Sequence, residues 1–134
     1  MKRTKARENA FILLFEAECR EDETPLEIFE YSSEFPDFEA DDFVKNVFFG
    51  VAERRKEIDE LIEANLVGWA KNRISPVSRA LLALATYEML ACEDIPDRVS
   101  INEAVELSKK YDDEKSYTFV NGVLNAISKS LQNS

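Results

Sequence analysis

The chain has 134 residues and a formal net charge of −10, and 45% of its residues are hydrophobic, including nine Phe. This length suits one domain, and this apolar content excludes a disordered chain. The sequence contains no run of about 18 apolar residues, which excludes a membrane span, and we expect a cytoplasmic protein. Only three Gly and four Pro are present, which predicts long regular elements.

Residue types that usually carry catalysis are scarce. Histidine is absent, which removes the commonest acid–base group and the commonest transition-metal ligand. No Gly-rich phosphate-binding loop occurs. Asp112, Asp113 and Glu114 lack the ligand spacing of a calcium loop and predict a solvated turn. We therefore expect neither an enzyme nor a bound cofactor or metal. Free cysteines are usually buried, so we expect Cys19 and Cys92 to be buried thiols.

Apolar residues recur at helical spacing from the start of the chain. The first predicted helix covers residues 4–20. The second begins at "TPLE", where Thr24 caps the helix, Pro25 fits its first turn and Glu27 closes a capping box. It ends near residue 35.

Residues 40–66 predict one long helix or two consecutive ones. Within this segment Gly50 indicates a close crossing with another helix, and "ERRKE" is a candidate bend. Gly68 is a plausible C-terminal signal, because glycine readily adopts the left-handed conformation that ends many helices.

The segment after residue 74 begins with "ISPVS", in which Ser75 is a candidate N-cap and Pro76 occupies the first helical position. The run "VSRALLALATYEMLAC" is apolar on most faces, which is typical of a central buried helix. We expect Glu88 within it to hydrogen-bond to a neighbouring loop. Ser100 and Glu103 in "SINE" predict a capping box at the start of the next helix.

The last predicted helix covers about residues 116–131, after the polar turn "YDDEKS". The sequence thus predicts an all-α protein of six or seven helices with no convincing strand. We expect one domain built from two small helical bundles, at about residues 1–67 and 68–134.

The chain begins with "MKRTKAR", a basic cluster in an acidic protein. Its basic residues are Lys2, Arg3, Lys5 and Arg7. Along the first helix, Arg3 and Arg7 fall in sectors next to Phe11 and Phe15. Basic residues interleaved with aromatic rings suit single-stranded RNA. The alternative is a basic terminus that covers two core Phe residues. The acidic remainder argues against broad binding to nucleic acid, because that binding needs a positive surface.

A phenylalanine of the last helix lies off its apolar stripe. Helical geometry turns each residue by about 100°, which projects Phe119 to one side, with Lys115 before it and Gly122 after it. These three residues suit a small nucleic-acid platform, in which the ring stacks on an unpaired base and the lysine neutralises a phosphate. The alternative is that Phe119 packs on another helix and Gly122 eases that contact.

Four segments resemble one protein family. The segment "DIPDRVSINEAVELSKKYDDEKSYTFVNGVLNAI" is similar to the C-terminal signature of the NusB family of bacterial transcription antitermination factors. "RTKARENAFILLFEAE", "GVAERRKEIDELI" and "RALLALATYEML" resemble the same family in the same order. The resemblance implies two perpendicular three-helix bundles. It also implies binding of boxA, a short single-stranded RNA element, together with the ribosomal protein NusE, so that RNA polymerase reads through terminators, notably in ribosomal RNA operons.

The resemblance also implies an RNA surface. Carried over to this chain, it comprises Lys2, Arg3, Lys5, Arg7, Phe15, Lys115 and Phe119. Phe15 stands where relatives can have a Tyr that contacts RNA, so the ring is kept and the hydroxyl is lost. Lysines replace part of an Arg-rich terminus, and lysine lacks the bidentate grip of arginine on phosphate. We therefore expect weak RNA binding by the chain alone and strong dependence on NusE.

NusE is expected to dock on a different surface. In "EIDELIEANL" the apolar Ile58, Leu61 and Ile62 point inward, which leaves Glu60 and Glu63 outward. An acidic patch would steer a basic ribosomal protein toward it. The alternative is an ordinary solvated helix face.

Two other functions are compatible with the sequence. NusB-like domains also occur fused to RNA methyltransferases, so one alternative is an accessory domain that holds RNA for a separate RNA-modifying enzyme. The other is a self-associating protein-interaction module, because some family members form homodimers. Self-association leaves the basic terminus unexplained.

Overall fold

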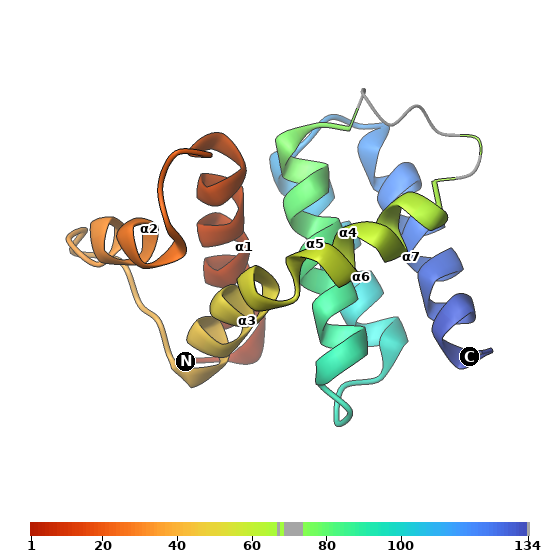
Figure 1. The fold of residues 1–134 in the computed structure, drawn as a ribbon, viewed down its shortest axis with the longest axis horizontal. Helices are drawn as coiled ribbons and strands as arrows, with labels where there is room; N and C mark the ends of the chain where they lie inside the picture. The colour runs from red at the N-terminus through yellow and green to blue at the C-terminus, as the bar shows by residue number, and fades with distance from the viewer. Residues whose placement is uncertain (67, 69–73, 134) are drawn as a thin grey trace.

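The computed structural model describes residues 1–66, 68 and 74–133, which form seven helices and no strand (Figure 1). The helices are α1 (Arg3–Cys19), α2 (Pro25–Ser32), α3 (Asp42–Glu53), α4 (Arg55–Ala64), α5 (Pro76–Ala91), α6 (Asp97–Tyr111) and α7 (Ser116–Gln132). The predicted all-α class is therefore confirmed. None of the described helices is long and apolar enough to cross a membrane.

Most predicted helix starts are confirmed by their caps. The hydroxyl of Thr24 accepts the backbone N–H of Glu27, and the Glu27 carboxylate accepts the backbone N–H of Thr24, which completes the capping box of α2. The Ser75 hydroxyl accepts the backbone N–H of Ser78 at the start of α5. The segment from residue 40 to 66 divides into α3 and α4, with the break at Arg54 within "ERRKE".

The predicted capping box at Ser100 and Glu103 is wrong. Helix α6 begins three residues earlier, at Asp97, and Pro96 occupies its N-cap position. Ser100 therefore lies inside the helix, where its hydroxyl donates to the Glu88 carboxylate. The "SINE" pattern matches the capping rule, but its two polar side chains are used for contacts between helices.

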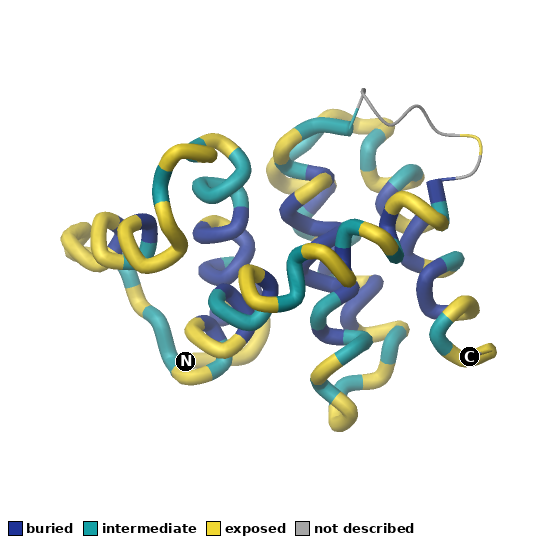
Figure 2. The backbone as a smooth tube through the Cα atoms, viewed as in Figure 1, coloured by how far each residue is buried: buried dark blue, intermediate teal, exposed yellow. Residues whose placement is uncertain are grey.

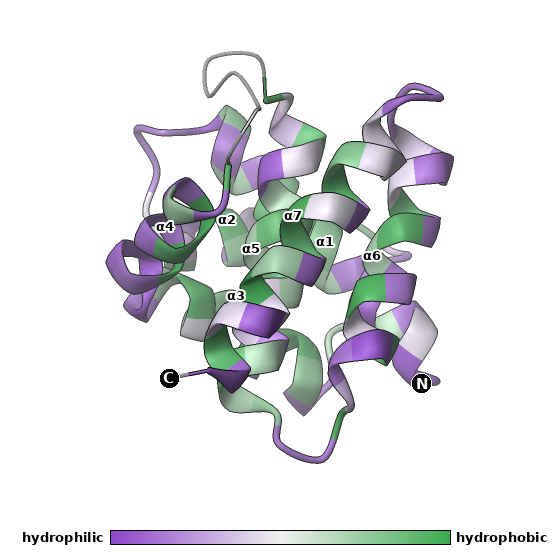
Figure 3. Ribbon diagram, turned by 90° about the vertical axis from the view of Figure 1, so that its right-hand side faces the viewer, coloured by the Kyte–Doolittle hydropathy of each residue, from purple (hydrophilic) through white to green (hydrophobic). Residues whose placement is uncertain are grey.

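Helix α5 forms the centre of the fold. Residues 80–85 of α5 are completely buried, and α5 contacts α1, α3, α4, α6 and α7. Figure 2 shows the dark buried stretches of the backbone concentrated where α5 meets its neighbours. In Figure 3 the hydrophobic colouring likewise follows the inward faces of the helices, and the outer faces are hydrophilic.

Two groups of three helices are recognisable. The members of the first, α1–α3, contact one another, and so do those of the second, α5–α7. Helix α4 follows α3 and packs against α5 and α7. It crosses in front of α5 in Figure 1. The proposed division near residue 67, which itself lies outside the described residues, stays a prediction.

Two glycines of the helices have opposite surroundings. A Cβ atom added at Gly50 of α3 would lie 2.3 Å from the hydroxyl oxygen of Tyr87 on α5, so the predicted close crossing is confirmed. A Cβ atom added at Gly122 of α7 would meet nothing within 4 Å. Gly122 therefore does not ease a contact between helices. Gly68 has a positive φ of 83°, but α4 has already ended at Ala64.

The prediction that both cysteines are buried is wrong for Cys19, which is exposed, and Cys92 is half-buried. Cys19 lies on the same side of α1 as Ile12, two helical turns earlier, and Ile12 is also exposed. This side of α1 faces solvent although it carries apolar residues.

Candidate nucleic-acid interface

The basic residues at the start of α1 do not share one face. Lys2, Arg3 and Lys5 are exposed, and Arg7 is buried. The guanidinium carbon of Arg3 lies 4.1 Å from the ring centroid of Phe43 on α3. Arg3 also lines a groove between α3 and α5 that includes Tyr87. Arg3 therefore faces α3 and α5, and Lys5 lies elsewhere on α1.

Arg7 forms a buried ion pair. Its Nε donates to Oε2 of Glu88 and its Nη2 donates to Oε1 of Glu88, each at 2.8 Å. Its Nη1 donates to Oε1 of Glu103 at 2.9 Å. The Arg7 residue is 2% exposed and Glu88 is completely buried. Burial disfavours the charged guanidinium, but the hydrogen bonds and the charge of Glu88 outweigh burial and raise the pKa of Arg7 above its ordinary value.

This ion pair changes the role of two residues. The Arg7 guanidinium is already bonded inside the protein, and the RNA contact predicted for it stays a prediction. The expectation that Glu88 bonds to a loop is wrong, because its partners are Arg7 on α1 and Ser100 on α6. The hydroxyl of Thr4 donates to Glu103, which adds a further bond between α1 and α6. Together these bonds hold the start of α1 against α5 and α6.

The last turn of α6 lies beside α1. The Nζ of Lys110 and the hydroxyl of Tyr111 both donate to Oε2 of Glu8, at 2.6 Å and 2.7 Å. The Tyr111 ring packs on Phe11 with 5.0 Å between ring centroids, and Phe11 in turn lies 6.3 Å from the Phe15 ring. The end of α6 thus contacts both the charged and the aromatic residues of α1.

The same turn of α6 also reaches α7. The Nζ of Lys109 lies 5.0 Å from the ring centroid of Tyr117. Tyr117 stands in the first turn of α7, next to the exposed Lys115 and two residues before the half-buried Phe119. The turn before α7 is held by Asp113, whose carboxylate accepts the backbone N–H of Lys115. Hydrogen bonds from Ser116 and Lys115 lower the pKa of Asp113.

We name the residues Lys109, Lys110 and Tyr111 the α6 bridge. The α6 bridge joins the two elements that the sequence predicted separately, the first helix and the start of the last one. A groove of about 460 Å³ runs between α1 and α6 along this junction. Its lining residues include Thr4, Glu8, Lys109 and Lys110.

Sequence reasoning missed the α6 bridge. The signal was present in "SKKY", which places two lysines and a tyrosine in the last turn of a helix. Cations in a last helical turn have an ordinary explanation, because they stabilise the negative end of the helix dipole. Tyr111, a large aromatic residue that is 40% exposed, distinguishes this turn from an ordinary one.

A second feature of the surface is a strongly acidic segment of the chain. Residues 16–42 contain twelve acidic side chains and one basic one, Arg20. This segment covers the end of α1, all of α2 and the start of α3, on the left of Figure 1. The acidic side chains on that side repel RNA, which is itself negatively charged.

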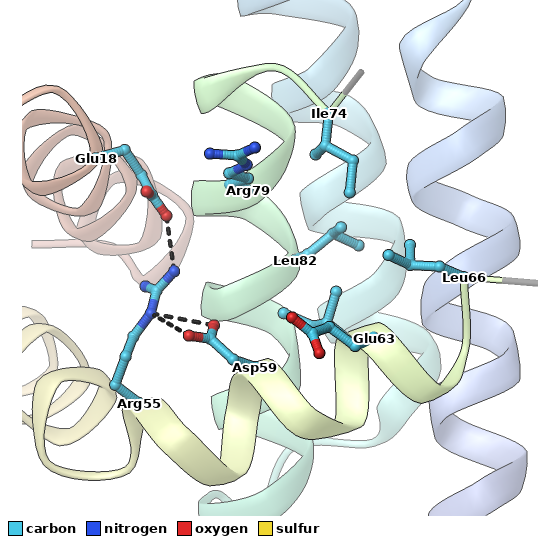
Figure 4. Close-up of a pocket in the computed structure, with 9 residues that line it drawn as sticks. Glu18, Arg55, Asp59, Glu63, Leu66, Ile74, Arg79 and Leu82 are labelled. Carbon is cyan, nitrogen blue, oxygen red and sulfur yellow. Dashed lines mark hydrogen bonds and ion pairs between the residues drawn. The ribbon is translucent and has the colours of Figure 1, made fainter. Parts of the chain in front are cut away.

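The two glutamates predicted to bind a partner are both exposed on α4. Glu63 lines a groove of about 200 Å³ with an apolar floor that includes Leu66 and Leu82 (Figure 4). At the other end of this groove, Nη2 of Arg55 donates to Oε1 of Glu18 at 2.8 Å (Figure 4).

Glu60 borders another surface of α4, which it shares with two further glutamates and two cations. The other residues there are Glu53, Arg54, Lys56 and Glu57. Arg54 and Lys56 offset most of the acidic charge, so this face steers a basic partner less strongly than the sequence suggested. Partner binding by Glu60 and Glu63 stays a prediction.

The fold and this surface define an all-α protein with a basic and aromatic strip across three helices. The strip comprises Lys5, Phe11 and Phe15 of α1, the α6 bridge, and Lys115, Tyr117 and Phe119 at the start of α7. Among the described residues, no group of three metal-ligating side chains is arranged to hold a metal ion. The model of the NusB family matches residues 4–129.

Similar proteins agree with this match. The transcription antitermination protein NusB of Clostridium perfringens (strain ATCC 13124) is 44% identical over an alignment of 136 positions. The alignment covers 98% of this chain and 100% of that protein. The solved structure of T. maritima NusB has a TM-score of 0.83 at 41% identity, covering 96% of this chain and 92% of that one. A structure of NusB and NusE with double-stranded RNA has a TM-score of 0.83 at 32% identity, covering 97% and 99%.

The chain belongs to the NusB family. It is a transcription antitermination protein and not an enzyme.

Proposed function

We propose that the chain binds boxA-type single-stranded RNA together with the ribosomal protein NusE, and that this complex supports read-through by RNA polymerase, notably in ribosomal RNA operons. The proposal places the protein in the cytoplasm, where transcripts are made. The observation that carries it is the α6 bridge, which connects basic and aromatic residues of α1 and α7 into one strip. A NusB similar to this chain forms a complex with NusE and double-stranded RNA, which supports NusE and RNA as partners here.

The proposed RNA contacts divide by chemistry. The cations proposed to neutralise phosphates are Lys5, Lys109, Lys110 and Lys115 in and near the α6 bridge, together with Lys2 just before α1 and Arg3 on a different face of α1. The rings proposed to stack on unpaired bases are Phe15, Tyr111, Tyr117 and Phe119. Base stacking on an aromatic ring contributes about 1–3 kcal/mol per base. Gly122 faces open space on α7, so a nucleotide approaches the helix backbone there without a steric barrier.

The NusE surface is proposed on α4, at Glu60 and Glu63. The groove that Glu63 lines has apolar residues at its floor and charged residues at its rim (Figure 4). This combination is typical of a protein interface. The lining of this groove includes Ile74 and, on α5, Leu82, whereas Lys109 and Lys110 of the α6 bridge line the other groove, between α1 and α6. Separate surfaces would let RNA and NusE bind at the same time.

The test is a titration of labelled boxA RNA with the full chain, with and without NusE. A scrambled RNA of the same length is the control for sequence. A boxA duplex is the control for strandedness, because the solved complex holds double-stranded RNA. We expect boxA to bind more tightly than either control, and NusE to strengthen that binding. Equal affinity for boxA and scrambled RNA in the presence of NusE contradicts the proposal.

Light scattering distinguishes this function from self-association into a homodimer whose interface covers the strip. A monomer that binds boxA directly agrees with the proposal. A dimer that dissociates when RNA is added indicates that self-association competes for the same residues. A dimer that binds boxA without dissociating places self-association on another surface.

A further inference from the structure

Glu8 lies where two cations of the strip, Lys5 and Lys110, converge. Its Oε2 accepts hydrogen bonds from Lys110 and Tyr111, at 2.6 Å and 2.7 Å. Its Oε1 lies 3.6 Å from the Nζ of Lys5, one helical turn earlier on α1. One carboxylate therefore engages three donors on two helices.

The three partners remain open to solvent although the carboxylate does not. The Glu8 side chain is 13% exposed, whereas those of Lys5 and Lys110 are 59% and 60% exposed. Tyr111 is 40% exposed. An anion from solution thus reaches both ammonium groups from outside, while Glu8 holds them from beneath.

These donors suit a phosphate as well as a carboxylate. Both anions present oxygen atoms that accept charge-assisted hydrogen bonds from lysine, and a hydroxyl donates to either. A phosphate that binds Lys5 and Lys110 has to share them with the Glu8 carboxylate, and the two negative groups then repel each other. Exposed ion pairs are weak, so this sharing is possible without unfolding the helix ends.

We propose that Lys5, Lys110 and Tyr111 form a site for a backbone phosphate of RNA, and that Glu8 occupies this site as an internal anion and thereby weakens RNA binding. The inference rests on the proposed function, since it concerns the same strip. It gives Glu8 a positioning role as well, because Glu8 holds the two lysines near each other before RNA arrives. Glu8 therefore keeps the affinity of this site for RNA low.

The test compares the boxA affinity of the wild-type chain with that of Glu8→Gln. The amide keeps the size of the side chain and an oxygen that accepts the Tyr111 hydroxyl, but it removes the charge. We expect Glu8→Gln to bind boxA about fivefold more tightly, with a steeper dependence on salt. Glu30→Gln is the matched control, because it removes the same charge from an exposed position on α2. We expect its boxA affinity to stay within about twofold of wild type.

A second comparison identifies the lysine involved. Lys110→Met should weaken boxA binding more in the Glu8→Gln background than in the wild-type background, because only there is Lys110 fully available to phosphate. Glu8→Asp keeps the charge but withdraws the carboxylate by one methylene, and we expect its boxA affinity between those of wild type and Glu8→Gln. Circular dichroism of each variant verifies the helical fold.

The outcomes separate this inference from the proposed function. If wild type binds boxA and a folded Glu8→Gln binds it equally or more weakly, Glu8 is not a competing anion and the inference is overturned. If Glu8→Gln does not fold, an affinity of Glu8→Asp at or below that of wild type overturns it as well. If neither wild type nor any variant binds boxA with NusE present, the proposed function itself fails.

Discussion

The guanidinium of Arg7 and the carboxylate of Glu88 are joined by two parallel hydrogen bonds of 2.8 Å inside the protein, across 81 positions of sequence. This pair fastens the start of α1 to the central helix α5. The basic terminus of the chain is therefore partly a structural element, and only its remaining cations face solvent.

Replacement of Arg7 should destabilise the fold. Arg7→Ala leaves the buried carboxylate of Glu88 without its cation, and loss of one partner of a buried pair typically costs about 3–5 kcal/mol. Urea unfolding monitored by circular dichroism measures the change. The double variant Arg7→Met/Glu88→Leu removes both charges and should recover part of the loss. Unchanged stability of Arg7→Ala, accompanied by weaker RNA binding, would show that Arg7 acts on RNA directly.

Alanine at the two glycines should change stability in opposite directions. Gly50→Ala places a methyl group against the Tyr87 ring, and such overpacking typically costs about 1–3 kcal/mol. Gly122→Ala meets no neighbour, and the better helix propensity of alanine should stabilise the protein by about 0.5–1 kcal/mol. Thermal unfolding of both variants measures these shifts. If Gly122 permits close approach of RNA, Gly122→Ala should also weaken boxA binding despite its higher stability.

Phe119 should contribute to RNA binding through its ring. Phe119→Ala is expected to weaken boxA binding by about 1–3 kcal/mol, the usual contribution of one stacked base. Its neighbour Val120 is completely buried, so Val120→Ala is the control for core packing and should lower stability by about 1.5 kcal/mol. Under conditions in which Val120→Ala is folded, its boxA affinity should equal that of wild type. Failure of Phe119→Ala to fold would assign the ring to the core instead.

The cations of the strip should determine the salt dependence of RNA binding. If four of them each neutralise one phosphate, the logarithm of the affinity should fall with the logarithm of salt concentration at a slope of about −3. Lys110→Met should make this slope shallower, by at most about 0.7 in the wild-type chain, because Glu8 already holds part of the Lys110 charge. Lys129→Met removes an exposed lysine from the other end of α7 and should leave the slope unchanged. A flat salt response in the wild-type chain would contradict phosphate binding by the strip.

The pair of Glu8 and Lys110 should give stability a defined pH dependence. The hydrogen bond from Lys110 lowers the pKa of Glu8 below its ordinary value of 4.5. The same bond raises the pKa of Lys110 above its ordinary value of 10.5. The contribution of the pair is therefore complete between these two ordinary values. It is lost as pH falls through the folded-state pKa of Glu8 or rises through that of Lys110.

The measurement is the difference in free energy of unfolding between wild type and Glu8→Gln across pH. We expect this difference to be constant near neutral pH and to fall toward zero in acid, as Glu8 becomes protonated. A difference that stays constant into strong acid would show that the Glu8 charge does not stabilise the fold.

Much of the fold could be predicted from the sequence because its signals are local. The capping box of Thr24 and Glu27 involves residues three positions apart, and the apolar repeat of α5 is periodic within one helix. Such patterns determine where a helix begins and which of its faces is buried. The capping box predicted at "SINE" was wrong for a related reason. Ser100 and Glu103 match the local pattern, but their side chains bond to other helices.

The site depended on contacts between distant segments. Lys110 bonds to Glu8 across 102 positions, and Arg7 bonds to Glu103 across 96. No local pattern states which of two neighbouring basic residues turns inward. Arg3 and Arg7 are one helical turn apart, yet only Arg7 meets the buried Glu88.

Local patterns in the sequence were enough to predict the all-α class, the positions of most helices and the presence of a basic, aromatic terminus. These properties depend on hydrogen bonds and periodicities within a few residues. The packing of the helices was needed to show that Arg7 is buried, that Lys5 and Lys110 share Glu8, and that the end of α6 connects α1 with α7. These properties depend on how α5 packs α1 and α6 against it, because that packing brings charges far apart in the chain within hydrogen-bonding distance.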